Sequence, residues 1–450
     1  MAMYKAYPEY KDSGIEWLGD IPEGWTVSKV KYLAPFQVGW TPPTKNDANF
    51  IGDNLWVNIS DLKDKFISST AKFISDKAAK EASMDITPKG SLLYSFKLSV
   101  GAVSFAGCDL YTNEAIASFL SHAQLPLSYL YYALPIFIIE NASTNIYGAK
   151  ILNQELIKNS FLLAPPHGEA EKVANFLDHE TAKIDNLIAK QQQLIELLKE
   201  KRQAVISHAV TKGLDPDVPM KDSGVEWLGG IPQHWGVTRL KYECRNIVDC
   251  PHSTPNYTDE GEYPAIRTAD ILAGYLDLQN CRRVTEPVYN ERNFRLIPKA
   301  GDIIYSREGE RFGIGAPIPE GAKVCLAQRV MLFRAKSTSG YLMWALNSSS
   351  TYTQAQQDCI GSTSPHVNVD TIKNFILAWP PESEREEISN FIHQTLDSVE
   401  SLTVHLTEKL TLLQERRTAL ISAAVTGKID VRDWVAPDTQ SIEEPQEATA

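Results

Sequence analysis

Two long segments of the chain carry hydrophobic residues at a period of seven, separated by polar and charged positions. Between Pro166 and Gly213 there is no proline and no glycine except Gly168, and Glu, Lys, Gln, Leu and Ala predominate. A seven-residue apolar repeat over five steps is typical of a coiled-coil seam. The pattern predicts one long helix over residues 166–213 and another over 381–428. The expected seam residues are Leu177, Ile184, Leu198, Val205, Ile392, Val399, Leu406, Leu413 and Leu420.

The predicted helices are long, and each stops beside a glycine. At about 1.5 Å per residue each would span roughly 65 Å. Gly213 and Gly427 can adopt the left-handed conformation that ends a helix. Because a whole domain separates the two helices in sequence, side-by-side antiparallel pairing is the simplest packing. Parallel pairing is the alternative, and it requires the second domain to span the full helix length.

The chain also repeats itself outside these helices. Lys11-Asp-Ser-Gly-Ile-Glu-Trp-Leu-Gly-Asp-Ile-Pro-Glu-Gly-Trp25 returns as Lys221-Asp-Ser-Gly-Val-Glu-Trp-Leu-Gly-Gly-Ile-Pro-Gln-His-Trp235, an offset of 210. The helix ends at residues 201–211 and 416–426 match with an offset of 215. A repeat of roughly 200 residues is a domain with a connecting element and not a solenoid unit. We therefore expect two copies related by an approximate two-fold axis.

Residues of about 26–165 and 236–380 read as two mixed α/β domains. Strand-like runs cover 55–62 and 264–271, and both end in Asp-Leu or Asp-Ile. The matching segments 90–95 and 301–306 each predict a glycine turn that leads into a buried strand. The fold class expected is mixed α/β, with two pseudo-symmetric globular domains separated by two long helices in an antiparallel coiled coil.

Charge and cysteine content limit the classes of protein that fit. The net charge of −12 argues at first sight against nucleic acid, since phosphate neutralisation needs Lys and Arg, but the two domains are each nearly neutral and can still carry a basic face. Much of the excess lies from Ile429 onward, where six acids face one arginine, so residues 429–450 are expected to form an acidic, disordered tail. Six cysteines without a CxxC pair fit a reduced, cytoplasmic protein. No apolar stretch reaches 18 residues, so no membrane span is expected.

No catalytic motif is found in the sequence. It lacks a Gly-x-x-x-x-Gly-Lys-Ser/Thr loop, a Gly-x-Ser-x-Gly elbow, His-Glu-x-x-His and a zinc-spaced Cys/His cluster. The Asn/Asp-Pro-Pro-Tyr/Phe motif of amino-methyltransferases is also missing. The chain is therefore expected not to be an enzyme and to bind no metal or cofactor.

The second domain offers arginines as candidate DNA contacts, because arginine can bind guanine O6 and N7 with two hydrogen bonds. Arg267 ends a strand-like run, and Arg307 and Arg311 lie in a predicted loop over 306–313. The alternative is that these two arginines pair with Glu308 and Glu310 on a solvated surface. A second predicted loop over 361–368 is either a DNA contact or a plain turn, and its candidates are Ser362, Thr363 and His366.

The first domain has lysine but no arginine between Ala34 and Leu163. Its candidate DNA contacts are Lys97, Asn145 and Lys150, and lysine suits phosphates better than forked base contacts. The repeated tryptophans Trp17, Trp25, Trp227 and Trp235 could stack on bases. Packing against the helix ends is the stronger interpretation, because aromatic side chains dominate cores.

Taken together, the repeated Asp-Ser-Gly-x-Glu-Trp-Leu-Gly segments, the Pro-Pro-x-x-Glu starts of both long helices and their Ile-Ser-x-Ala-Val-Thr ends resemble the specificity subunits of Type I restriction-modification systems. The resemblance covers nearly the whole chain. It implies that residues 1–165 and 214–380 are target recognition domains, each reading one half of a bipartite double-stranded DNA site. Residues 166–213 and 381–428 would be the conserved spacer helices.

The resemblance also implies partners for the chain. Two methyltransferase subunits would bind it and methylate adenine N6 with S-adenosylmethionine, and restriction subunits would add ATP- and Mg-dependent translocation and cleavage. The rival interpretation is a coiled-coil adaptor that carries two protein-binding domains and contacts no DNA. A self-contained nuclease or methyltransferase is disfavoured by the missing motifs.

Overall fold

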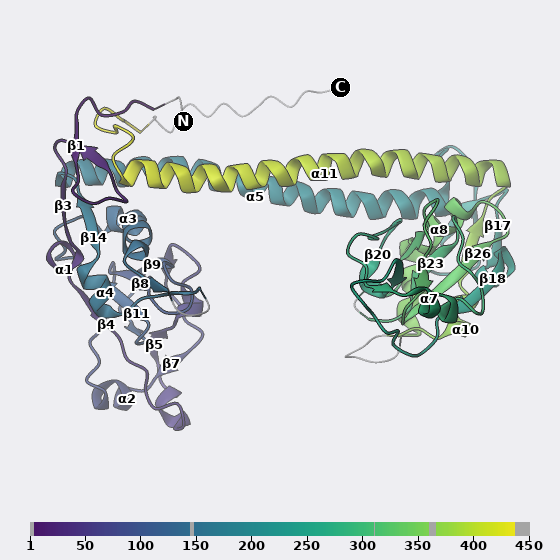
Figure 1. Ribbon diagram of the computed structural model, residues 1–450, viewed down its shortest axis with the longest axis horizontal. Coiled ribbons are helices and arrows are strands. Elements are labelled where there is room, and N and C mark those ends of the chain that lie inside the picture. Colours follow the sequence, from purple (N-terminus) through teal and green to yellow (C-terminus); the bar gives the residue numbers. More distant parts are fainter. Residues whose placement is uncertain (1–3, 145–147, 310, 360–365, 437–450) are drawn as a thin grey trace. The chain divides into compact units, whose positions relative to one another are not determined.

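The computed structural model describes residues 4–144, 148–309, 311–359 and 366–436 (Figure 1). The chain divides into two compact units. Unit 1 comprises residues 1–190 and 409–450, and unit 2 comprises residues 191–408. Each unit therefore contains one globular domain together with parts of both long helices.

In unit 1 the main sheet has five strands, and all neighbours are antiparallel except β6 and β9. Its order is β4 (Phe36–Val38), β11 (Ile116–Phe119), β8 (Leu92–Ser95), β9 (Val103–Ala106) and β6 (Phe66–Ile67). A second sheet has the order β10 (Tyr111–Thr112), β5 (Asn54–Val57) and β7 (Phe73–Ile74). The apolar helix α3 (Leu127–Glu140) packs beside β8, β9 and β14 (Phe161–Ala164), and half of its 14 residues are buried in the core.

The strands of unit 2 repeat this order without a counterpart of β6. Its main sheet is β18 (Cys244–Asp249), β26 (Val330–Ala335), β23 (Ile303–Ser306) and β24 (Gly315–Pro317). The smaller sheet is β22 (Arg283–Val284), β19 (Tyr263–Ile266) and β25 (Cys325–Leu326). Helices α8 (Ser339–Leu346) and α9 (Ser349–Gln357) follow. The predicted turn-fed strands are confirmed as β8 and β23, and all eight of their residues are buried.

The two strand-like runs are shorter than predicted. The strands end at Val57 and Ile266, and 3-10 turns follow at Ile59–Asp61 and Thr268–Asp270. The cause is the shared aspartate, because Asp61 accepts the backbone N–H of Asn58 at 2.9 Å and Asp270 accepts that of Arg267 at 2.8 Å. A carboxylate that captures this N–H replaces the strand partner with a local turn.

The long helices are α5 (His167–Lys212) and α11 (Glu382–Val425), as the heptad pattern predicted. They run antiparallel within each unit. In unit 1 Arg417 pairs with Asp185, with Nε and Oδ1 2.6 Å apart. In unit 2 Leu198 packs with Val399 and Leu406.

The helix surfaces differ from the heptad prediction in detail. Seven of the nine predicted seam residues are buried, whereas Val205 and Leu413 are half-buried. Ile206, one residue beyond Val205, takes the fully buried position. The apolar residues Leu187 and Leu402, which lie beside the seam, are nearly half exposed at 46% and 45%.

The duplicated sequence builds the same contacts twice. β3 (Thr26–Lys29) pairs with β14 (Phe161–Ala164), and β17 (Gly236–Arg239) pairs with β27 (Ile376–Trp379) in the equivalent register. Trp25 donates its indole N–H to Glu169 at 2.8 Å, and Trp235 donates to Glu384 at 2.9 Å. Both glutamates lie in the first turn of a long helix. The repeated tryptophan therefore ties each domain to the start of the helix that follows it.

Each domain also binds the end of the other long helix. In unit 1 the Tyr129 hydroxyl lies 3.3 Å from the carbonyl of Val425, at the end of α11. In unit 2 the Tyr341 hydroxyl lies 3.2 Å from the carbonyl of Val210, near the end of α5. Gly427 has a φ of +72°, and a Cβ there would approach Pro22 Cδ within 2.4 Å. Glycine is therefore required for the close approach of this helix end to the repeated segment.

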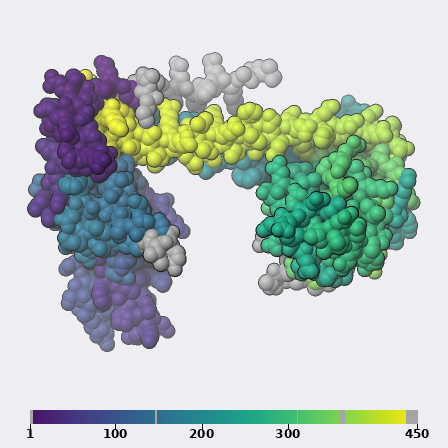
Figure 2. All heavy atoms as spheres, in the orientation of Figure 1, coloured from purple at the N-terminus to yellow at the C-terminus, as the bar shows by residue number. Residues whose placement is uncertain are grey.

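The first part of the expected tail is folded. Ile429 and Val431 are buried in the core of unit 1, and Asp430 donates its backbone N–H to the carbonyl of Lys5 at 2.8 Å. The Trp434 ring packs edge-on against Phe176 with centroids 5.7 Å apart. Figure 2 shows this yellow end of the chain against the purple N-terminal residues. The expectation of disorder from residue 429 is thus wrong for 429–436, because apolar residues alternate with the acids there; residues 437–450 lie outside the described part.

Candidate nucleic-acid interface

The predicted arginine and lysine loops occupy equivalent places in the two units. In unit 1 the chain leaves β8 at Phe96, whose N–H donates to the carbonyl of Ala115, just before β11, at 3.0 Å. In unit 2 it leaves β23 at Arg307, whose N–H donates to the carbonyl of Arg329, just before β26, at 3.2 Å. In each unit the loop therefore projects from the same end of the main sheet.

Arg307 is buried, with 7% of its surface exposed. Its Nε lies 3.2 Å from Asp249 Oδ1, and its Nη2 lies 3.0 Å from Glu308 Oε1. The pairing with Glu308 that the sequence offered as an alternative is present, and Asp249 at the end of β18 is a second partner. Two carboxylates that converge on one buried guanidinium hold it in place and satisfy its donors.

Arg329 shares this cluster and is the residue that sequence reasoning missed. Its side chain is 55% exposed, and its Nε lies 3.4 Å from Glu308 Oε2. Its φ of +64° is a left-handed conformation that is costly for a residue with a Cβ. Such strain is often found at binding sites. Nothing in the local sequence indicates it, because the backbone angle follows from how β25 and β26 are joined in the fold.

Arg267 and Arg311 form a second group beyond the end of β19, the central strand of the smaller sheet. Arg267 makes two side-chain bonds to Asp270, at 3.0 Å from Nε and 2.6 Å from Nη2. The hydrogen bond to Asp270 raises the pKa of Arg267 further above its usual value. Arg311 is exposed, and its Nη1 donates to the carbonyl of Ala269 at 2.9 Å. The turn that holds Arg267 therefore also holds the loop that carries Arg311.

His366 lies beside the Arg307 cluster. It forms an antiparallel bridge with Glu308, and the next residue, Val367, donates its N–H to the carbonyl of Arg307 at 3.0 Å. The exposed His252 adds a ring nitrogen 3.3 Å from Asp249 Oδ2. The structure thus brings His366, Arg307 and Arg329 to one sheet end. Ser362 and Thr363 lie outside the described residues.

In unit 1 the equivalent loop is less charged and more apolar. Lys97 Nζ lies 3.9 Å from Glu114 Oε1, and about half of each side chain is exposed. The neighbouring Leu98 is 86% exposed with a φ of +48°, and Trp40, just past the end of β4, is 53% exposed. Lys150 lies exposed on β13 (Lys150–Ile151), and Asn145 lies outside the described residues. The two units therefore present different chemistry at matching places.

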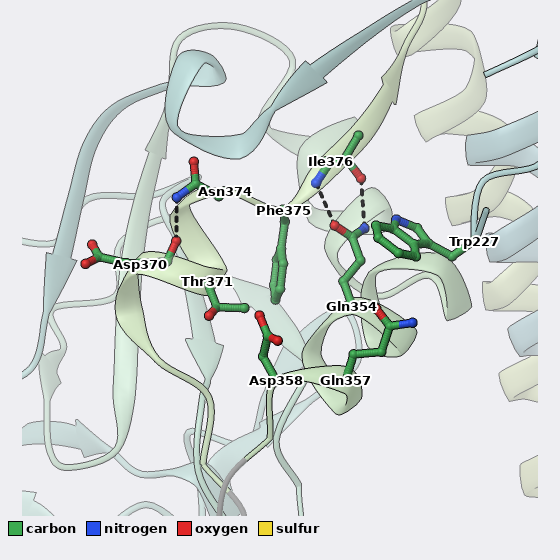
Figure 3. A pocket seen from close by; sticks show the side chains of 9 residues that line it. All are labelled: Trp227, Gln354, Gln357, Asp358, Asp370, Thr371, Asn374, Phe375 and Ile376. Atoms are coloured by element: carbon green, nitrogen blue, oxygen red, sulfur yellow. Dashed lines mark hydrogen bonds between the residues drawn. The ribbon is translucent and has the colours of Figure 1, made fainter. Parts of the chain in front are cut away.

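Two of the four tryptophans, Trp25 and Trp235, are fully packed, with 1% of each exposed. Trp17 packs against Phe137 with ring centroids 5.8 Å apart but is 44% exposed. Trp227 packs against the core of unit 2 and also lines a cavity of about 410 Å³ (Figure 3). Its buried indole N–H has no hydrogen-bond partner within the described part of the chain. Next to it in Figure 3, the Gln354 side chain hydrogen-bonds to the backbone N–H and carbonyl of Ile376.

The cysteines show no sign of catalytic activation. Burial raises the pKa of Cys244, Cys281 and Cys325 to about 12, so these thiols stay protonated near neutral pH. Among the described residues no group of His, Cys, Asp or Glu side chains is placed to hold a metal ion. Within that same part of the chain no helix has the length and apolarity needed to cross a membrane.

Comparison with known proteins places these features in a family. The model of the "Type I restriction modification DNA specificity domain" matches residues 22–197 and 248–412. The chain is 22% identical to the Type I restriction enzyme MjaIX specificity subunit of Methanocaldococcus jannaschii, with 96% of this chain and 99% of that protein covered. It is 23% identical to the EcoKI specificity subunit of Escherichia coli K12, with 96% and 95% covered.

Two solved structures share the fold. One, described as "Structural basis underlying complex assembly and conformational transition of the type I R-M system", has a TM-score of 0.68 at 14% identity and covers 91% of this chain and 99% of its own. The HsdS subunit from Thermoanaerobacter tengcongensis has a TM-score of 0.52 at 14% identity, covering 91% and 98%. The curated relatives are specificity subunits, which are non-catalytic, so this chain is not itself an enzyme. With the family model matched once in each half and over most of its length, the chain belongs to the Type I restriction-modification specificity subunits.

Proposed function

We propose that this chain reads a bipartite, asymmetric double-stranded DNA site, one half with each globular domain. The observation that carries the proposal is that the two units share one arrangement of strands and helices but present different side chains at the same place. The same sheet end displays Arg307, Arg329 and His366 in unit 2, but Lys97 and exposed apolar side chains in unit 1. Two readers of two different half-sites need this combination, because base contacts carry the sequence information.

The residues of unit 2 divide into contacting and positioning roles. Arg329 is the proposed base contact, because its guanidinium is exposed while Glu308 orients its Nε. An arginine presented in this way can bind guanine O6 and N7 together. The buried Arg307 is proposed to hold Glu308 and Asp249 in place through its two ion pairs. Arg267, Arg311, His366 and the predicted loop residues Ser362 and Thr363 are proposed to contact phosphates or neighbouring bases.

In unit 1 Lys97, Lys150 and Asn145 are proposed as the polar DNA contacts. Lysine fits phosphate as a compact charge, and the exposed Leu98 and Trp40 add apolar surface for base edges such as the thymine methyl group. The domain bounds proposed are 1–165 and 214–380, with spacer helices over 166–213 and 381–428. Their lengths would set the distance between the two half-sites.

The chain is also proposed to work within a larger complex in the cytoplasm. Two methyltransferase subunits would dock on it, and restriction subunits would join through them. S-adenosylmethionine, ATP and Mg would belong to those partners. A chain with a net charge of −12 gains from such partners, because basic subunits can supply phosphate contacts that it lacks.

The test is to map methylated adenines in cells that express the complete system, with wild-type chain or with Arg329→Ala. Wild type should give one bipartite motif. The Arg329→Ala variant should relax one base position in a single half-site, with discrimination there reduced by about 1–3 kcal/mol. The matched control Arg245→Ala removes an exposed arginine near the start of β18 and should leave the motif unchanged.

A non-DNA adaptor is the second candidate, and the same experiment separates the two. If the system methylates no defined motif, and the purified chain with its partners shifts no duplex DNA at low salt, the DNA proposal fails. If a motif is found but Arg329→Ala leaves it intact, only the role of Arg329 fails.

A further inference from the structure

One exposed surface is the same in both units. It lies on the short helices α1 (Val30–Leu33) and α6 (Leu240–Glu243), which pack against α4 (Gln154–Asn159) and α10 (Val369–Lys373). Each surface joins a lysine, a tyrosine and an asparagine, and we call them patch 1 and patch 2. Patch 1 consists of Lys31, Tyr32 and Asn159, and patch 2 of Lys241, Tyr242 and Asn374.

The internal contacts of the two patches match. Lys31 Nζ donates to Asn159 Oδ1 at 3.2 Å and lies 5.2 Å from the Tyr32 ring centroid. Lys241 Nζ donates to Asn374 Oδ1 at 2.8 Å and also lies 5.2 Å from its tyrosine ring centroid. The ammonium group is thus held between an amide and an aromatic face in both units, an attractive cation–π arrangement.

The tyrosines do not serve the cores. Tyr32 is 61% exposed and Tyr242 is 58% exposed, while their neighbours Val30 and Leu240 are fully buried. The fold therefore accounts for the repeated apolar neighbours but not for the repeated tyrosines. An exposed aromatic ring beside a preorganised cation is typical of protein interfaces, where tyrosine is enriched. A side chain that is already held loses less entropy when it binds.

The surroundings of the patches are cationic. Lys29 and Lys158 flank patch 1, and Arg239 and Lys373 flank patch 2. Arg239 Nη1 also donates to Asn374, at 3.0 Å. The acids nearby are Glu155 on α4, Asp370 on α10 and Glu243 on α6 itself. Lys373 Nζ lies 3.6 Å from Asp370 Oδ1. Positive groups still outnumber the negative ones at both patches, which fits a partner that presents carboxylates next to an apolar residue.

The patches are separate from the candidate DNA loops. Helix α6 leads directly into the first residue of β18, whereas Asp249 and the Arg307 cluster lie at the last residue. Six residues of strand span about 20 Å. The loops differ between the units, as different half-sites require, whereas the patches are alike, as one partner bound twice requires. In unit 2 the cavity of Figure 3 shares Asn374 with patch 2.

From these observations we infer that patches 1 and 2 are two equivalent docking surfaces for the same protein partner, one copy on each domain, through acidic residues on that partner. The inference rests on the proposed function, in which the repeated partner is the methyltransferase subunit. It assigns the docking to named residues of the recognition domains themselves.

The test combines Lys31→Glu with Tyr32→Ala, and Lys241→Glu with Tyr242→Ala, singly and together, in the full chain. The probe is the purified methyltransferase subunit of the same system, with stoichiometry read by native mass spectrometry. Wild type should bind two copies, either patch variant one, and the combined variant none up to concentrations about 30-fold above the wild-type Kd. The control, Phe294→Ala with Lys323→Glu, removes the same kinds of exposed side chain elsewhere and should bind two.

Each other outcome is decisive. Two copies bound to the combined variant with unchanged Kd would overturn the inference. A loss of DNA affinity in the isolated chain, with methyltransferase stoichiometry intact, would overturn it in favour of a phosphate-contacting surface. If wild type binds no methyltransferase at all, the partner named under the proposed function fails, and the docking assignment fails with it. Unchanged circular dichroism and melting of the variants show that any loss is not due to misfolding.

Discussion

Replacing Arg307 with methionine tests whether this buried arginine supports the recognition loop or reads DNA itself. Arg307 is 7% exposed and joins Asp249 to Glu308, whose side chains are 17% and 21% exposed. Removal of one member of a buried ion pair costs about 3–5 kcal/mol, because the remaining charge stays unpaired. Here each carboxylate keeps a second partner, His252 or Arg329, which offsets part of that loss. We therefore expect Arg307→Met to destabilise unit 2 by roughly 2–3 kcal/mol.

This cost should appear as a melting shift of about 5–10 °C for a unit of this size. Arg329→Met is the matched control, because it removes an exposed arginine from the same cluster and should cost less than about 1 kcal/mol. Adding Asp249→Asn and Glu308→Gln to Arg307→Met should restore part of the loss, because no unpaired charge then remains. The reasoning is refuted if Arg307→Met melts like Arg329→Met while the half-site loses discrimination, since Arg307 would then be the base contact.

Three further outcomes are expected. Trp25→Phe and Trp235→Phe should each lower the free energy of unfolding by about 1.5–3 kcal/mol, because each removes a hydrogen bond to a glutamate. Denaturant unfolding measures this loss, and two variants as stable as wild type would contradict it. The hydrogen bond from Arg432 lowers the pKa of Asp430, so the ionised carboxylate stabilises the fold above the unfolded pKa of about 3.9, and this stabilisation is lost as the pH falls through the lower folded pKa. The difference in unfolding free energy between wild type and Arg432→Leu should therefore shrink in acid, and a difference that grows below pH 4 would refute the reasoning. Thiol titration at pH 8 should label the partly exposed Cys108 and Cys359 quickly and the four buried cysteines only after unfolding. Rapid labelling of all six in the native protein would contradict the burial.

Local sequence patterns were enough to predict the two long helices, two buried strands and the duplication. The heptad pattern predicted both long helices to within a few residues of their ends, because the buried face of a helix consists of residues at a regular, short spacing in the sequence. The glycine-led runs at 90–95 and 301–306 predicted two buried strands, and the doubled Asp-Ser-Gly segment predicted duplication. These features depend on residues that are close in sequence, or on simple identity between two segments.

Contacts between distant residues decided the rest. The sequence left helix pairing open between two directions, and two contacts of unit 1 show the antiparallel one, because Lys172 meets Arg432 whereas Asp185, farther along α5, meets Arg417. It also could not show that residues 429–436 fold back onto unit 1, since their partners, such as Lys5 for Asp430 and Phe176 for Trp434, lie more than 250 positions away. The acidic composition alone therefore suggested a disordered tail from residue 429. In the structure the burial of Ile429 and Val431 keeps residues 429–436 folded despite their acidic neighbours.

The candidate site shows the same division most clearly. The sequence marked Arg307 and Arg311 in one loop of unit 2 but could not tell the buried side chain from the exposed one, because burial and backbone strain arise only when β18, β23 and β26 meet. Their meeting places Arg307 between two carboxylates and leaves Arg329 exposed at a φ of +64°. A pattern along the chain can therefore indicate which residue types are present, whereas the side chain that faces solvent is chosen by the packing of strands distant in sequence.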